Sequence, residues 1–81
     1  MSDDSVLGRI SALVDEEHRL RQQLSAGEIS SAEEQARLNT LEEALDQCWD
    51  LLRRRRAARQ EGRDPDEVVA RPVGEVEGYL Q

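Results

Sequence analysis

Two series of apolar residues, stepping alternately by three and four positions, place the strongest constraint on how this chain folds. Such steps repeat every seven residues and put an apolar stripe along one side of an α-helix, as in coiled coils. The series cover residues 6–24 and 38–52. Their seam residues are Val6, Ile10, Leu13, Leu20, Leu38, Leu41, Leu45, Cys48 and Leu52. The pattern predicts an all-α fold in which two helices pack along this seam.

Capping residues mark both ends of the first helix. Ser2 is suited to cap a helix, and the acidic residues at positions 3 and 4 suit its positive first turn. Gly27 offers the left-handed backbone conformation that commonly ends a helix. The sequence therefore predicts a first helix over residues 3–25.

A second helix begins at a capping box formed by Ser30 and Glu33, and no helix-breaking residue follows until Gly62. We expect this helix over residues 31–60. The link between the two helices is too short for anything but an antiparallel turn. Residues 1–62 are therefore predicted to form an antiparallel helical hairpin of the coiled-coil type.

The two apolar series also predict the register of the hairpin. If Leu20 faces Leu38, the other apolar pairs follow along the seam without a slip. The same register places the acidic start of the first helix beside the arginines of the second, with Asp3 next to Arg55. Opposite charges then meet at the open end of the hairpin, which favours the antiparallel arrangement.

Glu17 is the charged member of the first series, at a position where an unpaired buried charge would be unfavourable. It can lean outward and pair with Arg21 one helical turn later, which is the interpretation we favour. The alternative is that Glu17 sets the register or the oligomeric state, as polar seam residues do in coiled coils.

Further apolar residues flank the seam on both helices. They are Leu7, Val14, Ala44, Trp49 and Leu51. A single hairpin buries one seam only, so these side chains are expected to form a dimer or partner interface. The simplest arrangement is a homodimer in which two hairpins form a four-helix bundle with twofold symmetry. The alternative is a monomer in which the C-terminal tail folds back over them.

A basic collar lies near the end of the second helix. It consists of Arg53, Arg54, Arg55, Arg56 and Arg59. One interpretation is that the collar binds an external anion or nucleic acid. The other is that acids of the same chain neutralise it, and the candidates are Asp3, Asp4, Asp50, Glu75 and Glu77. The net charge of -7 and the lack of interleaved aromatic residues disfavour nucleic-acid binding, so we expect internal pairing.

Residues 63–81 form an acidic C-terminal tail. Pro65 after a capping aspartate predicts a short helical turn near residues 65–70, which Pro72 stops. Beyond it we expect an extended, flexible segment that becomes ordered only where it docks in a groove. The residues expected to dock are Val76, Tyr79 and Leu80.

Motifs for catalysis or metal binding are weak in this sequence. Cys48 is the single cysteine, which excludes an intramolecular disulfide and fits a reducing cytoplasm. Asp15 and His18 have the spacing of di-iron bundles, but the heptad places both on the solvent side, so a ferritin-like metal site across a dimer is a distant alternative. We therefore expect a non-enzymatic cytoplasmic protein, with no cofactor and no membrane segment, that acts by binding a protein partner.

Three segments carry a resemblance to a known family. They are residues 13–21, the run Leu-Asp-Gln-Cys-Trp-Asp-Leu-Leu-Arg at 45–53, and the end Val-Glu-Gly-Tyr-Leu-Gln at 76–81. Together they resemble a family of short actinobacterial proteins of unknown function, and the likeness covers nearly the whole chain. The resemblance implies no catalytic or binding residues, but its extension into the tail implies that the tail has a role.

Overall fold

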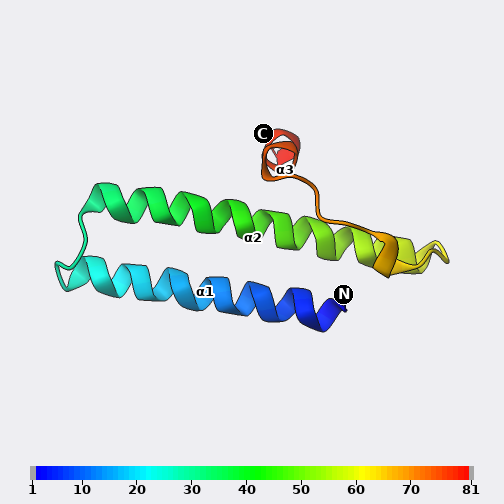
Figure 1. Ribbon diagram of the computed structural model, residues 1–81, viewed down its shortest axis with the longest axis horizontal. Helices are drawn as coiled ribbons and strands as arrows, with labels where there is room; N and C mark the ends of the chain where they lie inside the picture. Colours follow the sequence, from blue (N-terminus) through cyan, green and yellow to red (C-terminus); the bar gives the residue numbers. More distant parts are fainter. Residues whose placement is uncertain (1, 81) are drawn as a thin grey trace.

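The computed structural model describes the backbone of residues 2–80 and the side chains of residues 2–77. Two long helices, α1 (Asp3–Ser25) and α2 (Ser31–Gln60), pack antiparallel, and a 3-10 turn, η1 (Pro65–Glu67), and a short helix, α3 (Val73–Leu80), follow them (Figure 1). No strand occurs between residues 2 and 80. The fold is elongated, with extents of 51 × 26 × 13 Å. The prediction of an all-α antiparallel hairpin is confirmed.

The ends of the long helices follow from their capping residues. The hydroxyl oxygens of Ser2 and Ser30 each accept a hydrogen bond of 3.1 Å from the backbone amide three residues later. Gly27 and Gly62 adopt positive φ angles of 74° and 77°, which terminate α1 and α2. With 30 residues against 23, α2 is the longer helix and extends past the start of α1 (Figure 1).

The hydrophobic core lies near the open end of the hairpin. Its buried cluster contains Val6, Ile10, Cys48, Leu51 and Leu52. Partly buried residues packed against this cluster are Leu13, Leu45 and Val68. Toward the turn, Leu20 and Leu41 are buried but Leu38 is only half-buried. The core is therefore dense where α1 begins and looser where the two helices join.

One charged contact agrees with the predicted register, and a second one pairs the charged residue of the seam. Asp3 and Arg55 meet at 2.9 Å between Oδ1 and Nε, as the antiparallel register requires. Within α1, Glu17 pairs with Arg21 at 3.5 Å, and the Glu17 side chain is 18% exposed, so its carboxylate is partly buried beside an exposed guanidinium. Charge at the seam is thereby accommodated by a salt bridge within the same helix.

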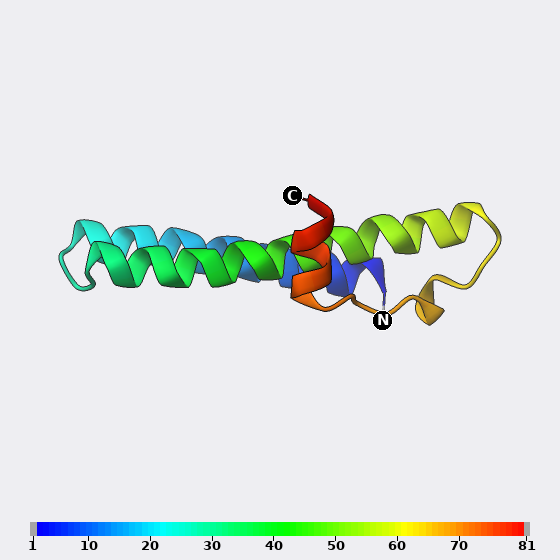
Figure 2. The ribbon, with the colours of Figure 1, turned by 90° about the horizontal axis from the view of Figure 1, so that it is seen from above.

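The C-terminal tail differs from the prediction. The helical turn ends at Glu67 instead of near residue 70, and residues 73–80 form α3 instead of a flexible, extended segment. After α2 the chain reverses and returns past the start of α1, and α3 then crosses α2 on the side away from α1 (Figures 1 and 2). The reason for the helix is tertiary, because Val76 is only 2% exposed. The side chains of Tyr79 and Leu80, also expected to dock, lie outside the described side chains.

Candidate functional site

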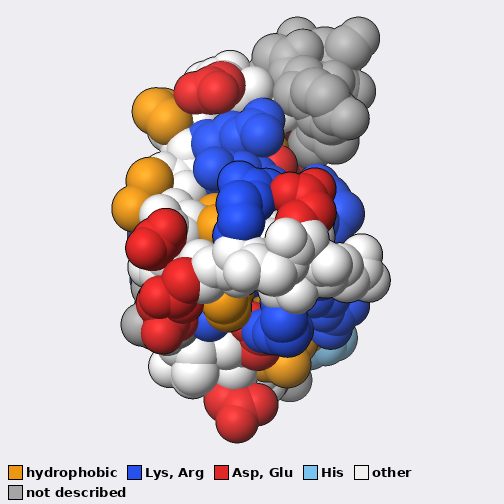
Figure 3. All heavy atoms as spheres, turned by 90° about the vertical axis from the view of Figure 1, so that its right-hand side faces the viewer, with side chains coloured by type: hydrophobic (Ala, Val, Ile, Leu, Met, Phe, Trp, Pro, Cys, Tyr) orange, Lys and Arg blue, Asp and Glu red, His pale blue; other side chains and the backbone are white. Residues whose placement is uncertain are grey.

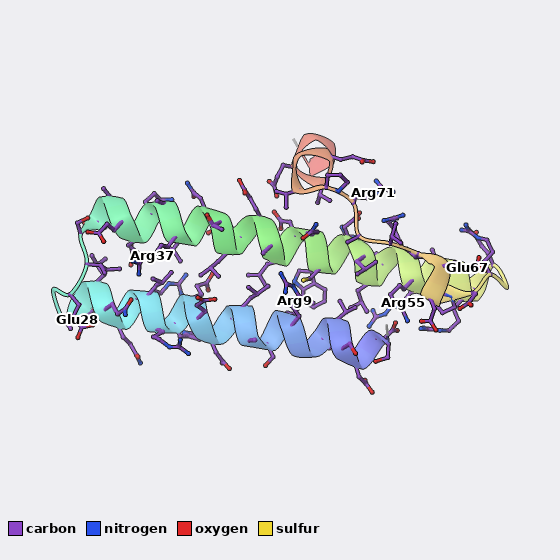
Figure 4. All side chains as sticks on the ribbon, viewed as in Figure 1. Arg9, Glu28, Arg37, Arg55, Glu67 and Arg71 are labelled. Atoms are coloured by element: carbon purple, nitrogen blue, oxygen red, sulfur yellow. The ribbon has the colours of Figure 1, made fainter. Side chains whose placement is uncertain are left out.

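Arg55 joins three elements at the open end of the hairpin (Figure 4). Arg55 is only 2% exposed although it carries a full charge. The guanidinium donates to Asp3 Oδ1 at 2.9 Å, to the carbonyl oxygen of Pro65 at 2.8 Å and to Asp66 Oδ1 at 3.0 Å. Because Asp3 lies in α1 while Pro65 and Asp66 lie in η1, Arg55 fixes the start of α1 and the η1 turn to α2.

Asp3 is held by two arginines. Besides Arg55, Arg59 donates to Asp3 Oδ2 at 2.8 Å. The hydrogen bond from Arg55, and after it the one from Arg59, lowers the pKa of Asp3. In return the hydrogen bond to Asp3 raises the pKa of Arg55, against the opposing effect of burial. The pair is therefore ionised at neutral pH.

Two further side chains of α2 hold the returning segment by its backbone. Arg54 Nη1 donates to the carbonyl oxygen of Val69, and Gln47 Nε2 donates to that of Arg71, both at 2.8 Å. The carboxylate of Asp50, a residue only 6% exposed, lies 3.7 Å from both Arg54 and Arg71. Its Oδ2 atom has no hydrogen-bond partner, so these two arginines balance the buried charge by proximity alone.

These contacts show which arginines of the basic collar are neutralised by acids of the same chain. Pairing of Arg54 with Asp50 and of Arg55 with Asp3 agrees with the expected internal neutralisation. Arg53 and Arg56 are exposed and have no ion pair within the part of the chain that is described. Viewed from this end, acidic and basic side chains alternate over the surface (Figure 3).

Glu77 was expected beside the collar, and this expectation is wrong. It lies instead against the acidic surface of α2, where a side-chain hydrogen bond with Asp46 raises the pKa of Glu77. Burial raises the pKa further, as do the negative charges of Asp46, Glu43 and Glu42. Its Oε1 atom is buried without a hydrogen-bond partner. Packing of α3 on α2 therefore places the Glu77 carboxyl group beside that of Asp46, which favours protonation of Glu77. Asp4 and Glu75 form no ion pair with the collar within the described residues.

One side of the hairpin carries an apolar strip, defined as Leu7, Val14 and Trp49. These side chains are 40%, 36% and 42% exposed. All three occupy the heptad position that follows the seam residue, so they lie on the same side of the seam. Within the single chain they remain partly exposed to solvent.

The two other residues assigned to that interface lie elsewhere. Leu51 is only 5% exposed and belongs to the core cluster, so the prediction that it contacts a partner is wrong. The physical reason is that Val68, from the returning segment, packs against this cluster. Ala44 is half-buried and lines a groove on the opposite side of the seam.

The groove lined by Ala44 has a volume of about 730 Å³ and is formed by α1 and α2. We call it the arginine groove. Its lining residues are Arg9, Leu13, Glu16, Arg19, Leu20, Gln23, Ala36, Arg37, Thr40, Leu41 and Ala44. Arg9 reaches from α1 and Arg37 from α2 into the space between the helices (Figure 4). Both, like Arg19, are exposed and make no ion pair or hydrogen bond with any described residue.

Sequence reasoning missed this groove because its arginines are isolated along the chain. The available signal was their heptad position, since Arg9 and Arg37 both precede a seam residue. In an antiparallel pair such positions lie on the same side of the seam.

The described residues give no support for a metal centre. No group of three or more histidine, cysteine, aspartate or glutamate side chains that could hold a metal ion occurs among them. Asp15 and His18 are both exposed, and Cys48 is a buried free thiol. None of the described helices combines the length and the apolar character needed to cross a membrane.

Comparison with known proteins agrees with the resemblance noted in the sequence. Residues 2–81 match the family model described as a protein of unknown function, DUF2630. Uncharacterized proteins of Mycobacterium bovis and Mycobacterium tuberculosis are 56% identical over 78 residues, which is 96% of this chain and 90% of theirs. No solved structure matches the chain. The chain therefore belongs to the DUF2630 family.

Proposed function

We propose that this protein is a non-enzymatic interaction module whose hairpin forms a homodimer through the apolar strip. The observation that supports the proposal is the exposure of Leu7, Val14 and Trp49 on one side of the seam. Three large apolar side chains gathered on one face are more typical of an interface than of a solvated surface. In a twofold dimer each strip packs against its own copy, which gives a four-helix bundle. The free thiol of Cys48 suits a cytoplasmic setting.

The size of this face suits a dimer. The 23 residues of α1 give a length of about 35 Å, and two adjacent helices give a width of about 20 Å. The face therefore offers about 700 Å² on each copy, close to the roughly 800 Å² per partner that is common in stable complexes. The alternative function, anion or nucleic-acid binding through the basic collar, has less support, because Arg54, Arg55 and Arg59 already hold groups of the same chain.

The molecular mass in solution tests the proposal, by light scattering or sedimentation. The wild-type protein is expected at twice the chain mass of 9.2 kDa. Val14→Glu places a charge in the middle of the strip and should yield a monomer, whereas Val69→Glu is the matched control. Val69 is 72% exposed but lies outside the strip, and its backbone carbonyl accepts a hydrogen bond from Arg54.

The comparison of the two variants also has a clear negative result. A monomeric wild-type protein, or equal masses for Val14→Glu and Val69→Glu, would contradict dimerisation through the strip. Circular dichroism of each variant shows whether the helices are intact, so that loss of the dimer is separated from loss of the fold.

A further inference from the structure

We infer that the arginine groove binds an acidic amphipathic α-helix of another protein. The groove lies on the side of the seam opposite the apolar strip. The inference therefore goes beyond the proposed dimer and does not depend on it.

The floor of the groove is apolar and has the length of a helical ligand. Leu20 and Leu41 at its base are 5% and 7% exposed, so the apolar surface open to a ligand comes mainly from Leu13, Ala36 and Ala44. Along α1 the lining runs from Arg9 to Gln23, which corresponds to about 21 Å or about four helical turns. A helix laid in such a groove buries one apolar stripe and keeps its other face in water.

The charges around the floor determine the chemistry of the partner. The charged lining residues are three arginines and one acid, Glu16, on a chain whose net charge is -7. Arg9, Arg19 and Arg37 have no partner among the described residues, so each can donate hydrogen bonds to a carboxylate of the ligand without breaking an existing contact. Guanidinium groups pair with carboxylates through two parallel hydrogen bonds. A helix with acids on both sides of an apolar stripe could pack its stripe on the apolar lining residues and pair its acids with the arginines.

The same charges disfavour other occupants. A second copy placed here by a twofold axis would bring the arginines of each copy together, and like charges across an interface are unfavourable. A nucleic acid would find no aromatic residue in the lining on which to stack its bases. It would also meet the negative field of the rest of the molecule.

Binding of a synthetic peptide to the full-length protein tests the inference. The probe is a labelled 14-residue helical peptide with leucines on one face and glutamates on the other, followed by fluorescence anisotropy. A second peptide carries lysine in place of every glutamate. We expect the glutamate peptide to bind with an affinity that falls as salt is raised, and the lysine peptide to bind at least about tenfold more weakly.

Two double variants locate the site. Arg9→Glu with Arg37→Glu should lower the affinity for the glutamate peptide by about tenfold or more. The matched control is Arg53→Glu with Arg56→Glu, because these arginines are also exposed and unpaired within the described chain but lie outside the groove. Glu16→Gln removes the acid from the lining and should strengthen binding.

Several results would overturn the inference. They are no binding of the glutamate peptide at physiological salt, an equal loss in both double variants, or tighter binding of a duplex DNA probe with the same dependence on Arg9 and Arg37. The mass of each variant is measured in the same samples. A Val14→Glu monomer that still binds the peptide separates this site from the proposed dimer interface.

Discussion

Replacing Leu52 with alanine tests whether the core is concentrated at the open end of the hairpin. Leu52 is 1% exposed and lies within the buried cluster of both long helices. Truncating a fully buried leucine destabilises a protein by about 2–5 kcal/mol, because apolar contacts are lost and a cavity remains. A chain of 81 residues has a total stability of about 4–12 kcal/mol, so a loss of about 3 kcal/mol is a large fraction of it.

Leu38→Ala is the matched comparison. Leu38 occupies the same heptad position as Leu52, two heptads earlier in α2, but is only half-buried near the turn. Truncating a leucine that keeps part of its surface in water re-exposes less area and leaves no closed cavity, so we expect a loss of about 1 kcal/mol. The same substitution at equivalent seam positions should therefore differ about threefold in its effect on the free energy of unfolding.

Urea unfolding followed by far-UV circular dichroism measures both effects. With a slope of about 1 kcal/mol/M for a small protein, Leu52→Ala should lower the midpoint by about 3 M and Leu38→Ala by about 1 M. All samples need the same protein concentration, because dimerisation would make stability concentration-dependent. Equal shifts, or a larger shift for Leu38→Ala, would refute a core concentrated at the open end.

Further predictions concern backbone conformation and pH. Gly8→Ala should raise the free energy of unfolding by about 0.5–1 kcal/mol, because Gly8 lies inside α1 with open space around an added Cβ. Gly27→Ala should lower it by about 1–2 kcal/mol, because φ is +74° there, and thermal unfolding compares the two. The pKa of docked Glu77 is raised, so its contribution to α3 packing is present below about pH 4 and is lost as pH rises through the raised pKa. Glu77→Gln should therefore protect residues 63–72 from proteolysis at neutral pH better than the wild type does. The pKa of Asp3 is lowered, so its contribution is present above about pH 4 and is lost as pH falls through the lowered pKa, and Asp3→Asn should remove this loss from urea midpoints measured in acid.

The hairpin could be predicted from sequence because its determinants are local. Heptad steps mark the buried side of each helix, while Ser2, Ser30, Gly27 and Gly62 act within a few residues of the helix ends they define. A short link then allows only one arrangement of the two helices. The register followed from the same pattern, with Asp3 beside Arg55 as a check that the structure provides.

The tail could not be predicted because tertiary contacts determine it. A segment of eight residues that contains two glycines has little helical preference of its own, yet residues 73–80 are helical where Val76 is buried on α2. The arginine groove has the same origin. Arg9 and Arg37 are separated along the chain, and only the folded hairpin brings them to one surface.

Side chains of α2 hold residues 65–71 by hydrogen bonds to backbone oxygens, and this has a consequence for how sequences in the family can vary. The carbonyl oxygens of residues 69, 65 and 71 accept hydrogen bonds from Arg54, Arg55 and Gln47, respectively. Every amino acid supplies such an oxygen. We therefore expect substitutions within residues 65–71 to be tolerated wherever the main-chain path is kept, and substitutions of the donating side chains to be tolerated less. Among homologues, we expect position 69 to change freely, and positions 47, 54 and 55 to retain donors of similar reach.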